Sequence, residues 1–207
     1  ILYKPSPLTR VNFTQITNNK VSQYYDRMYK YNPDGLLKHY DNSRTSILQL
    51  TKNLTRNTYL NFGITSFNKK YEHFAFDDKN EYVHNEVSSS RPYSFLTGGS
   101  NNSFFNRNTS STVFKGDVSS QLKNNLVKVG FEYRTHKLNY HSSSYQPSIS
   151  QISFDPSKDS PFLIDPILPS DSTIFSSRFS FEPYEISFYL QDKIELKNFI
   201  INAGIRF

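Results

Sequence analysis

Residues 127–134 read Val127-Lys128-Val129-Gly130-Phe131-Glu132-Tyr133-Arg134, in which apolar or aromatic side chains alternate with polar side chains or glycine. Successive side chains of an extended chain point to opposite faces, so a period of two residues is the signature of a β-strand. One face of this strand is apolar and the other carries charges. The stretch therefore predicts a strand that lies between two different environments.

Further runs with the same period flank this strand, and short polar turns join the runs in pairs. The turns fall at residues 55–57, 123–125 and 197–198, where Asn and Lys interrupt the alternation. Consecutive strands joined by short turns pair antiparallel, so we predict an all-β chain built as an antiparallel meander of about six strands. The alternating runs are 44–54, 60–65, 114–122, 127–134, 184–191 and 199–207.

The connections between the hairpins are long and polar. A compact soluble domain rarely contains loops beyond about 12–15 residues. Short turns at one end and long loops at the other are the organisation of outer-membrane barrels, with periplasmic turns and extracellular loops. We therefore expect part of a transmembrane β-barrel over residues 1–207, with hairpins at 43–72, 111–141 and 182–207 and extracellular loops at 1–42, 73–110 and 142–181.

The alternation also fits a soluble or surface-attached β-sandwich that binds glycan or protein. A sandwich packs its apolar face inward against a second sheet, whereas a barrel turns that face toward lipid. The polar face lines either a hydrated lumen or a solvated exterior. The loop lengths favour the barrel, and the sandwich stays open as the alternative.

Composition excludes several other classes of protein. The 207 residues carry a net charge of +6 without a run of five like charges, so we expect no nucleic-acid partner. The chain has no cysteine, which excludes disulfides, thiolate metal sites and a cysteine nucleophile. No apolar stretch approaches the roughly 18–20 residues of a membrane-spanning helix. The chain begins at Ile1 and ends at Phe207 inside an alternating run, so we expect a fragment of a longer protein.

Specific strings resemble the barrel of TonB-dependent outer-membrane receptors. An aromatic-rich strand that ends in Gln191-Asp192 is followed, after a short turn, by an apolar strand that ends in Gly204-Ile205-Arg206-Phe207. This pattern resembles the mid-barrel hairpin of that family. Residues 114–134 resemble the preceding hairpin, and residues 48–67 resemble an earlier one.

The resemblance implies a place in the outer membrane and energy-coupled uptake of a scarce nutrient: an iron chelate, cobalamin, a glycan or a peptide. It implies four kinds of partner, namely outer-membrane lipid, a plug domain with the remaining barrel strands, the TonB energy-coupling complex, and the nutrient ligand, which is a small molecule or an oligomer. The plug has no counterpart in this chain, and such barrels have about 22 strands. The resemblance does not imply an enzyme.

A candidate ligand-binding loop precedes the first hairpin. It concentrates tyrosines and a cation, which bind ligands by stacking and cation–π contacts. The alternative is an aromatic loop that packs on itself or forms an interfacial girdle. The candidate residues are Tyr24, Tyr25, Arg27, Tyr29 and Tyr31.

Polar-face residues are the candidates for contact with the barrel lumen. Lys115, Gln121, Glu132 and Arg134 lie on the polar sides of two predicted strands. In a barrel they would contact a plug or line the route past it.

The sequence contains no arrangement that predicts catalysis, a cofactor or a metal. His136 and His141 fall on opposite faces of a strand, which is poor geometry for one ion. The spacing of the loop aspartates fits no EF-hand. These aspartates are Asp155, Asp159, Asp165 and Asp171.

Overall fold

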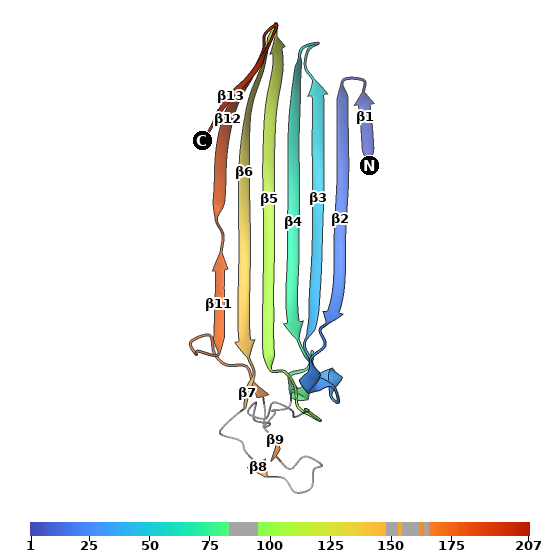
Figure 1. The fold of residues 1–207 in the computed structure, drawn as a ribbon, viewed down its shortest axis with the longest axis vertical. Helices are drawn as coiled ribbons and strands as arrows, with labels where there is room; N and C mark the ends of the chain where they lie inside the picture. The colour runs from blue at the N-terminus through green and yellow to red at the C-terminus, as the bar shows by residue number, and fades with distance from the viewer. Residues whose placement is uncertain (83–94, 148–152, 155–161, 164–165) are drawn as a thin grey trace.

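The computed structural model describes residues 1–82, 95–147, 153–154, 162–163 and 166–207. One antiparallel sheet of nine strands dominates these residues, in the order β1-β2-β3-β4-β5-β6-β12-β13, with β11 also paired to β6 (Figure 1). Its strands are β1 (Leu2–Ser6), β2 (Thr9–Gln23), β3 (Lys38–Asn53), β4 (Thr58–Phe74), β5 (Ser103–Leu122), β6 (Asn125–Ser144), β11 (Ser176–Phe181), β12 (Tyr184–Glu195) and β13 (Ile200–Arg206).

The remaining described elements are small and gather near the long connections. They are three short 3-10 helices and two ribbons of two strands each, in which β10 pairs with β7 and β8 pairs with β9. No described helix is both long enough and apolar enough to cross a membrane. The bounds are η1 (Arg27–Tyr29), η2 (Pro33–Gly35), η3 (Lys79–Glu81), β7 (Gln146–Pro147), β8 (Ser153–Phe154), β9 (Phe162–Leu163) and β10 (Pro166–Ile167).

All the short turns lie at one end of the sheet, as the sequence predicts. The β3–β4, β5–β6 and β12–β13 connections gather at the top of Figure 1, together with the β1–β2 connection. The described parts of the long connections, such as β7, lie at the opposite end. In the β5–β6 turn Lys123 has a φ of 53°, and the side-chain amide of Gln121 donates to its carbonyl at 2.7 Å. That hydrogen bond stabilises a left-handed residue in a tight hairpin.

The sheet has more and longer strands than the sequence predicts. The loop predicted over residues 1–42 is wrong for residues 2–23, which form β1 and β2. The loop predicted at 73–110 is too long because β5 begins at Ser103, and the one at 142–181 is too long because β11 begins at Ser176. Part of β2, residues 17–20, has polar side chains on both faces, so it shows no alternation. Its backbone pairs continuously with β3.

Each long strand has two zones. In β4 the side chains on one face change from Leu60, Phe62 and Ile64 to Ser66 and Asn68. We call the part near the short turns the turn-proximal zone and the rest the loop-proximal zone. Twenty residues of β5 or β6 extend over about 65 Å, whereas about 9–11 tilted residues cross a bilayer. The border between the zones is the row of Leu48, Ile64, Phe114 and Tyr133.

Strands β11 and β12 are one extended segment with an interruption. Phe181 pairs with Leu138 and Tyr184 pairs with Thr135, so the register is the same on both sides of the gap. Pro183 has no N–H to donate, which breaks the ladder there. Its carbonyl still accepts from the amide of His136 at 2.9 Å. The last predicted hairpin therefore begins earlier, at Ser176.

Candidate functional site

The apolar face of the turn-proximal zone is exposed. Val129 is 53% exposed and Phe131 is 40% exposed, although both lie in the middle of the sheet. Their row neighbours on β12 are also exposed, Leu190 at 49% and Phe188 at 59%. Among the described residues no second sheet covers this surface. A continuous apolar band of this size marks a surface that contacts another apolar phase or molecule.

The opposite, polar face buries charge. Asp117 of β5 is only 7% exposed. Its carboxylate accepts from the side-chain amide of Asn61 at 2.9 Å and from the hydroxyl of Tyr189 at 3.4 Å, and it lies 3.2 Å from Nζ of Lys128. Three neighbouring strands therefore supply partners for one carboxylate, which offsets the cost of burying it.

Glu132 of β6 is the centre of a second network on this face and is 8% exposed. Arg134 donates to its carboxylate at 2.6 Å, and Arg206 and Lys115 lie 3.7 and 3.9 Å away. The chain thus places its carboxylates among cations and exposes its large apolar side chains. A soluble sheet has the reverse arrangement.

Gly130 leaves room for the ring of Tyr189 in this network. The ring of Tyr189 lies directly over Gly130, where a Cβ would stand 2.4 Å from the ring. The ammonium groups of Lys115 and Lys128 lie 6.0 and 5.9 Å from the ring centroid. Gly130 is required here for close approach.

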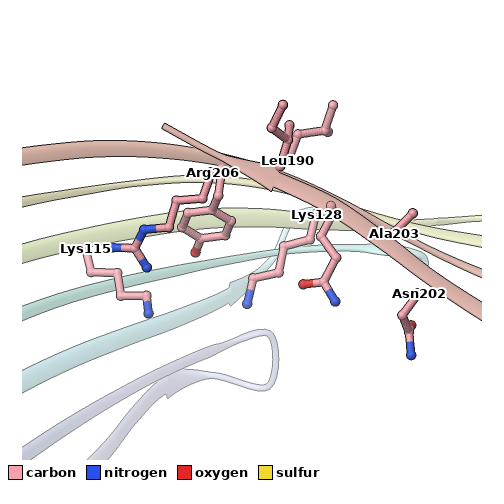
Figure 2. Close-up of a pocket in the computed structure, with 10 residues that line it drawn as sticks. Lys115, Lys128, Leu190, Asn202, Ala203 and Arg206 are labelled. Carbon is pink, nitrogen blue, oxygen red and sulfur yellow. The ribbon is translucent and has the colours of Figure 1, made fainter.

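Beside Tyr189 the polar face is hollowed over about 450 Å³, where β12 and β13 meet the neighbouring strands. Figure 2 shows Lys115, Lys128 and Arg206 projecting to one side of the sheet, whereas Leu190 projects to the other. Of the four residues predicted to face a lumen, Lys115, Glu132 and Arg134 share one network on this face. Gln121 lies on the same face but hydrogen-bonds its own turn.

The loop-proximal zone of the polar face carries a row of rings that we call the aromatic ladder. It crosses five strands, from β3 through β4, β5 and β6 to β11. The ring centroids are 5.2 Å apart for His39 and His73, 5.1 Å for His73 and Phe105, 5.2 Å for Phe105 and Tyr140, and 4.5 Å for Tyr140 and Phe179. Tyr71 completes the ladder and contacts the His39, His73 and Phe105 rings.

Two histidines stand at one end of the ladder, beyond the apolar band. Nδ1 of His39 lies 2.8 Å from the hydroxyl of Tyr71, and Nε2 of His73 lies 3.3 Å from the hydroxyl of Ser103. Burial lowers the pKa of His39 below its ordinary value. Burial and then the neighbouring His39 lower the pKa of His73. Both rings are therefore neutral at pH 7.

The candidate ligand-binding loop packs in part on itself. The amide of Leu96 donates to the carbonyl of Met28 at 2.7 Å, so residues 24–37 rest on residues 95–101. Tyr31 makes an edge contact with Phe95, with centroids 5.2 Å apart. Tyr29 is half-buried, and burial raises the pKa of its hydroxyl. The half-buried Tyr29 fits the self-packing alternative, whereas Tyr31 is 60% exposed.

The remaining members of that loop lie at the end of the ladder. The ring of Tyr24 meets His39 edge-on with centroids 4.8 Å apart, which extends the ladder toward the loop. Tyr24, Tyr25, Arg27 and His39 line an open hollow of about 540 Å³. The loop and the ladder thus form one candidate binding surface.

Sequence analysis does not identify the ladder, because each strand contributes only one or two of its rings. Residues 39, 73, 105, 140 and 179 are far apart in the chain, and only the register brings them together. A usable signal exists in the paired rings near strand ends, such as His73-Phe74 and Phe104-Phe105, which place an aromatic group on each face.

The described residues contain no group of three or more metal-ligating side chains. Asp171 pairs with Arg178 at 3.1 Å. His141 makes an edge contact with Phe104 on the apolar face, whereas His136 lies on the polar face, 3.6 Å from Glu185. The other loop aspartates, at 155, 159 and 165, lie outside the described residues.

No protein-family model matches the sequence, and no curated protein matches it. Among solved structures, the chain is similar to the outer membrane transporter YddB from Escherichia coli, with a TM-score of 0.60 and 12% sequence identity. The match covers 99% of this chain and 26% of that transporter, so this chain spans about a quarter of its length. The chain has the fold of part of an outer membrane transporter: an open antiparallel meander.

Proposed function

We propose that this chain is a section of barrel wall in an outer-membrane transporter, and that the whole protein is a TonB-dependent receptor for a scarce nutrient. The observation that carries the proposal is the inverted distribution of side chains in the turn-proximal zone. Val129 and Phe188 are exposed while Asp117 and Glu132 are buried. Lipid hydrocarbon is the environment in which such an apolar face is stable.

The apolar band has the height that a membrane requires. On β12 it runs over 11 residues from Tyr184 to Ile194, which matches the roughly 9–11 tilted residues that cross a bilayer. Asp192 interrupts this face near the short turns, where the side-chain amide of Asn125 donates to its carboxylate at 2.8 Å. The polar strand ends beyond the band then project into water, so the long connections are extracellular and the short turns periplasmic.

The polar face then lines the lumen and contacts the plug. Lys115 and Arg206 keep 51% and 58% of their side chains exposed beside the hollow of Figure 2. They are available for carboxylates of a plug domain. Gln121 and Arg134 join this surface.

Both ends of the sheet offer unpaired backbone. Among the strands that the structure describes, β1 pairs only with β2, and β13 pairs only with β12. Open strand edges are not stable in hydrocarbon, because their N–H and C=O groups find no partner there. The remaining barrel strands of the whole protein are the natural partners of both edges.

The competing hypothesis is a soluble or surface-attached β-sandwich that binds glycan or protein. It requires a second sheet over the apolar face, and the described residues contain only two-stranded ribbons besides the main sheet. The apolar band extends over the whole sheet from Val11 to Ile205. Two ribbons cannot cover it.

The test uses cells that express the full-length protein carrying this sequence. We expect the protein in the outer-membrane fraction. Uptake of one labelled nutrient among an iron chelate, cobalamin, a glycan and a peptide should be lost when either this gene or the TonB complex is deleted. Unchanged uptake without the TonB complex would contradict energy coupling, and a soluble protein would contradict the barrel.

A further inference from the structure

The polar face carries two populations of cations. In the turn-proximal zone each cation of the central network has a carboxylate partner: Lys128 has Asp117, and Lys115 and Arg206 have Glu132. Four cations, these three and Arg134, surround the two buried carboxylates, so each cation is already engaged in an ion pair although the net charge is positive.

The loop-proximal zone differs. Arg107 lies against the ring of Tyr71, with its guanidinium carbon 5.9 Å from the centroid. Arg27 and Lys30 lie 5.7 and 5.8 Å from the ring centroid of Phe95. All three cations are exposed, and none forms an ion pair with a carboxylate among the described residues.

Two carboxylates belong to this surface. Asp26 lines the same hollow as Arg27 and accepts a hydrogen bond from the backbone amide of Met28 at 2.9 Å. Asp41 of β3 lies 2.9 Å from Nζ of Lys69, which neutralises it. The two histidines of the ladder are neutral at pH 7 and add flat rings without charge. The zone therefore combines a surplus of positive charge with flat rings.

The rings keep accessible surface for a ligand. Phe179 is 37% exposed and Tyr24 is 64% exposed, while the rings between them are half-buried by contact with one another. Mutual contact holds the rings in fixed positions, so a ligand that stacks on them does not have to order them. Aromatic side chains bind flat apolar groups in this way.

From this juxtaposition we infer that the aromatic ladder, with Arg107 and the loop cations Arg27 and Lys30, binds an anionic small molecule that carries flat conjugated rings. The rings of the ladder stack on the flat part, and the guanidinium of Arg107 binds an acidic oxygen through its planar fork. This inference rests on the proposed function. The inference favours an acidic nutrient that carries flat rings over a neutral glycan.

The test compares two probes on the full-length protein purified in detergent. Pyrenetetrasulfonate is flat and anionic, and maltohexaose is neutral; each is titrated by equilibrium dialysis against a protein-free micelle control. We expect the sulfonate to bind more tightly than the glycan, with an affinity that falls as salt is raised. Arg107→Gln should weaken sulfonate binding by about tenfold or more, because it removes a charge-assisted hydrogen bond.

Two further variants separate the contributions of charge, ring and fold. Arg178→Gln removes an arginine next to the same row on the opposite face and should leave sulfonate binding unchanged. Phe105→Leu removes a central ring of the ladder while keeping an apolar side chain, and should weaken binding severalfold. Heat-modifiable migration on gels checks that each variant forms a barrel.

Three outcomes would overturn the inference: no sulfonate binding, tighter binding of maltohexaose, or equal sulfonate affinity in wild type and Arg107→Gln. Fractionation of the same cells is scored separately. A protein found in the outer membrane with any of these outcomes would contradict the anionic ligand and leave the transporter in place. A protein absent from the outer membrane would contradict the transporter itself.

Discussion

The two faces of β6 place neighbouring residues in opposite environments. Val129 and Phe131 are exposed at 53% and 40%, whereas Glu132, next in the chain, is exposed at 8%. In a soluble protein these values would be reversed. This difference shows that the sheet derives little stability from a core of its own. Its apolar face needs an apolar phase to contact. Its charged face depends on the ion-pair and hydrogen-bond network that crosses the strands.

Substitution on the apolar face has the largest expected effect. Val129→Arg in the full-length protein should lower the free energy of unfolding by about 2–4 kcal/mol if the residue lies near the bilayer midplane. A refolding titration in lipid vesicles measures it. The matched control is Gln49→Arg, an exposed polar-face position opposite Gly63, which should cost little. Equal costs at the two positions would remove the distinction between the faces.

A methyl group at Gly130 should have the next largest effect. Gly130→Ala places a Cβ where the ring of Tyr189 now lies, and overpacking of this kind costs about 1–3 kcal/mol. The same titration measures it. Tyr189→Ser removes the ring, so the alanine should cost less in that background, although the carbonyl oxygen of Gly116 still lies 2.8 Å from the added Cβ. Additive costs in the double variant would show that the ring and the glycine do not interact.

Loss of the buried carboxylate has a smaller expected effect. Glu132→Ala leaves Arg134, Arg206 and Lys115 without their shared partner, but these cations are 38%, 58% and 51% exposed. Solvent screens them, so the cost should be about 1 kcal/mol. Glu185→Gln, at a carboxylate that is 65% exposed, is the control. A larger cost at Glu185 than at Glu132 would contradict the network.

Acidification should loosen the loop-proximal zone slightly. The pKa values of His39 and His73 are lowered in the folded chain, so unfolding takes up protons and stability falls as pH drops below the ordinary histidine value. Amide protection factors, which divide out the intrinsic pH dependence of exchange, should fall at these strand ends between pH 7 and 5.5, and not in the turn-proximal zone. The double variant His39→Gln with His73→Gln should lose most of this pH dependence. The remainder belongs to His141, whose pKa is also lowered, first by burial and then by Arg178. Retention of the full pH dependence would assign the effect to other groups.

The sequence predicts the turn-proximal zone well and the loop-proximal zone poorly. Alternation identifies a strand only where its two faces meet different environments, as at Val129 and Glu132. Residues 17–20 of β2 are polar on both faces and leave no such signal. The aromatic ladder depends on register between residues as distant as His39 and Phe179, which no local pattern encodes. The Gly130 and Tyr189 contact is hidden for the same reason.

The measurement that tests the central claim most directly is a nitroxide scan of β6. The chain contains no cysteine, so single cysteines at residues 127–134 provide unique labelling sites if any cysteines elsewhere in the full-length protein are replaced. In lipid vesicles, labels at Val127, Val129 and Phe131 should collide with dissolved oxygen, while labels at Lys128 and Arg134 should collide with a water-soluble nickel complex. Two results would contradict the account: labels at every position collide with the nickel complex, or labels at Lys128 and Arg134 collide with oxygen while those at Val127, Val129 and Phe131 collide with nickel.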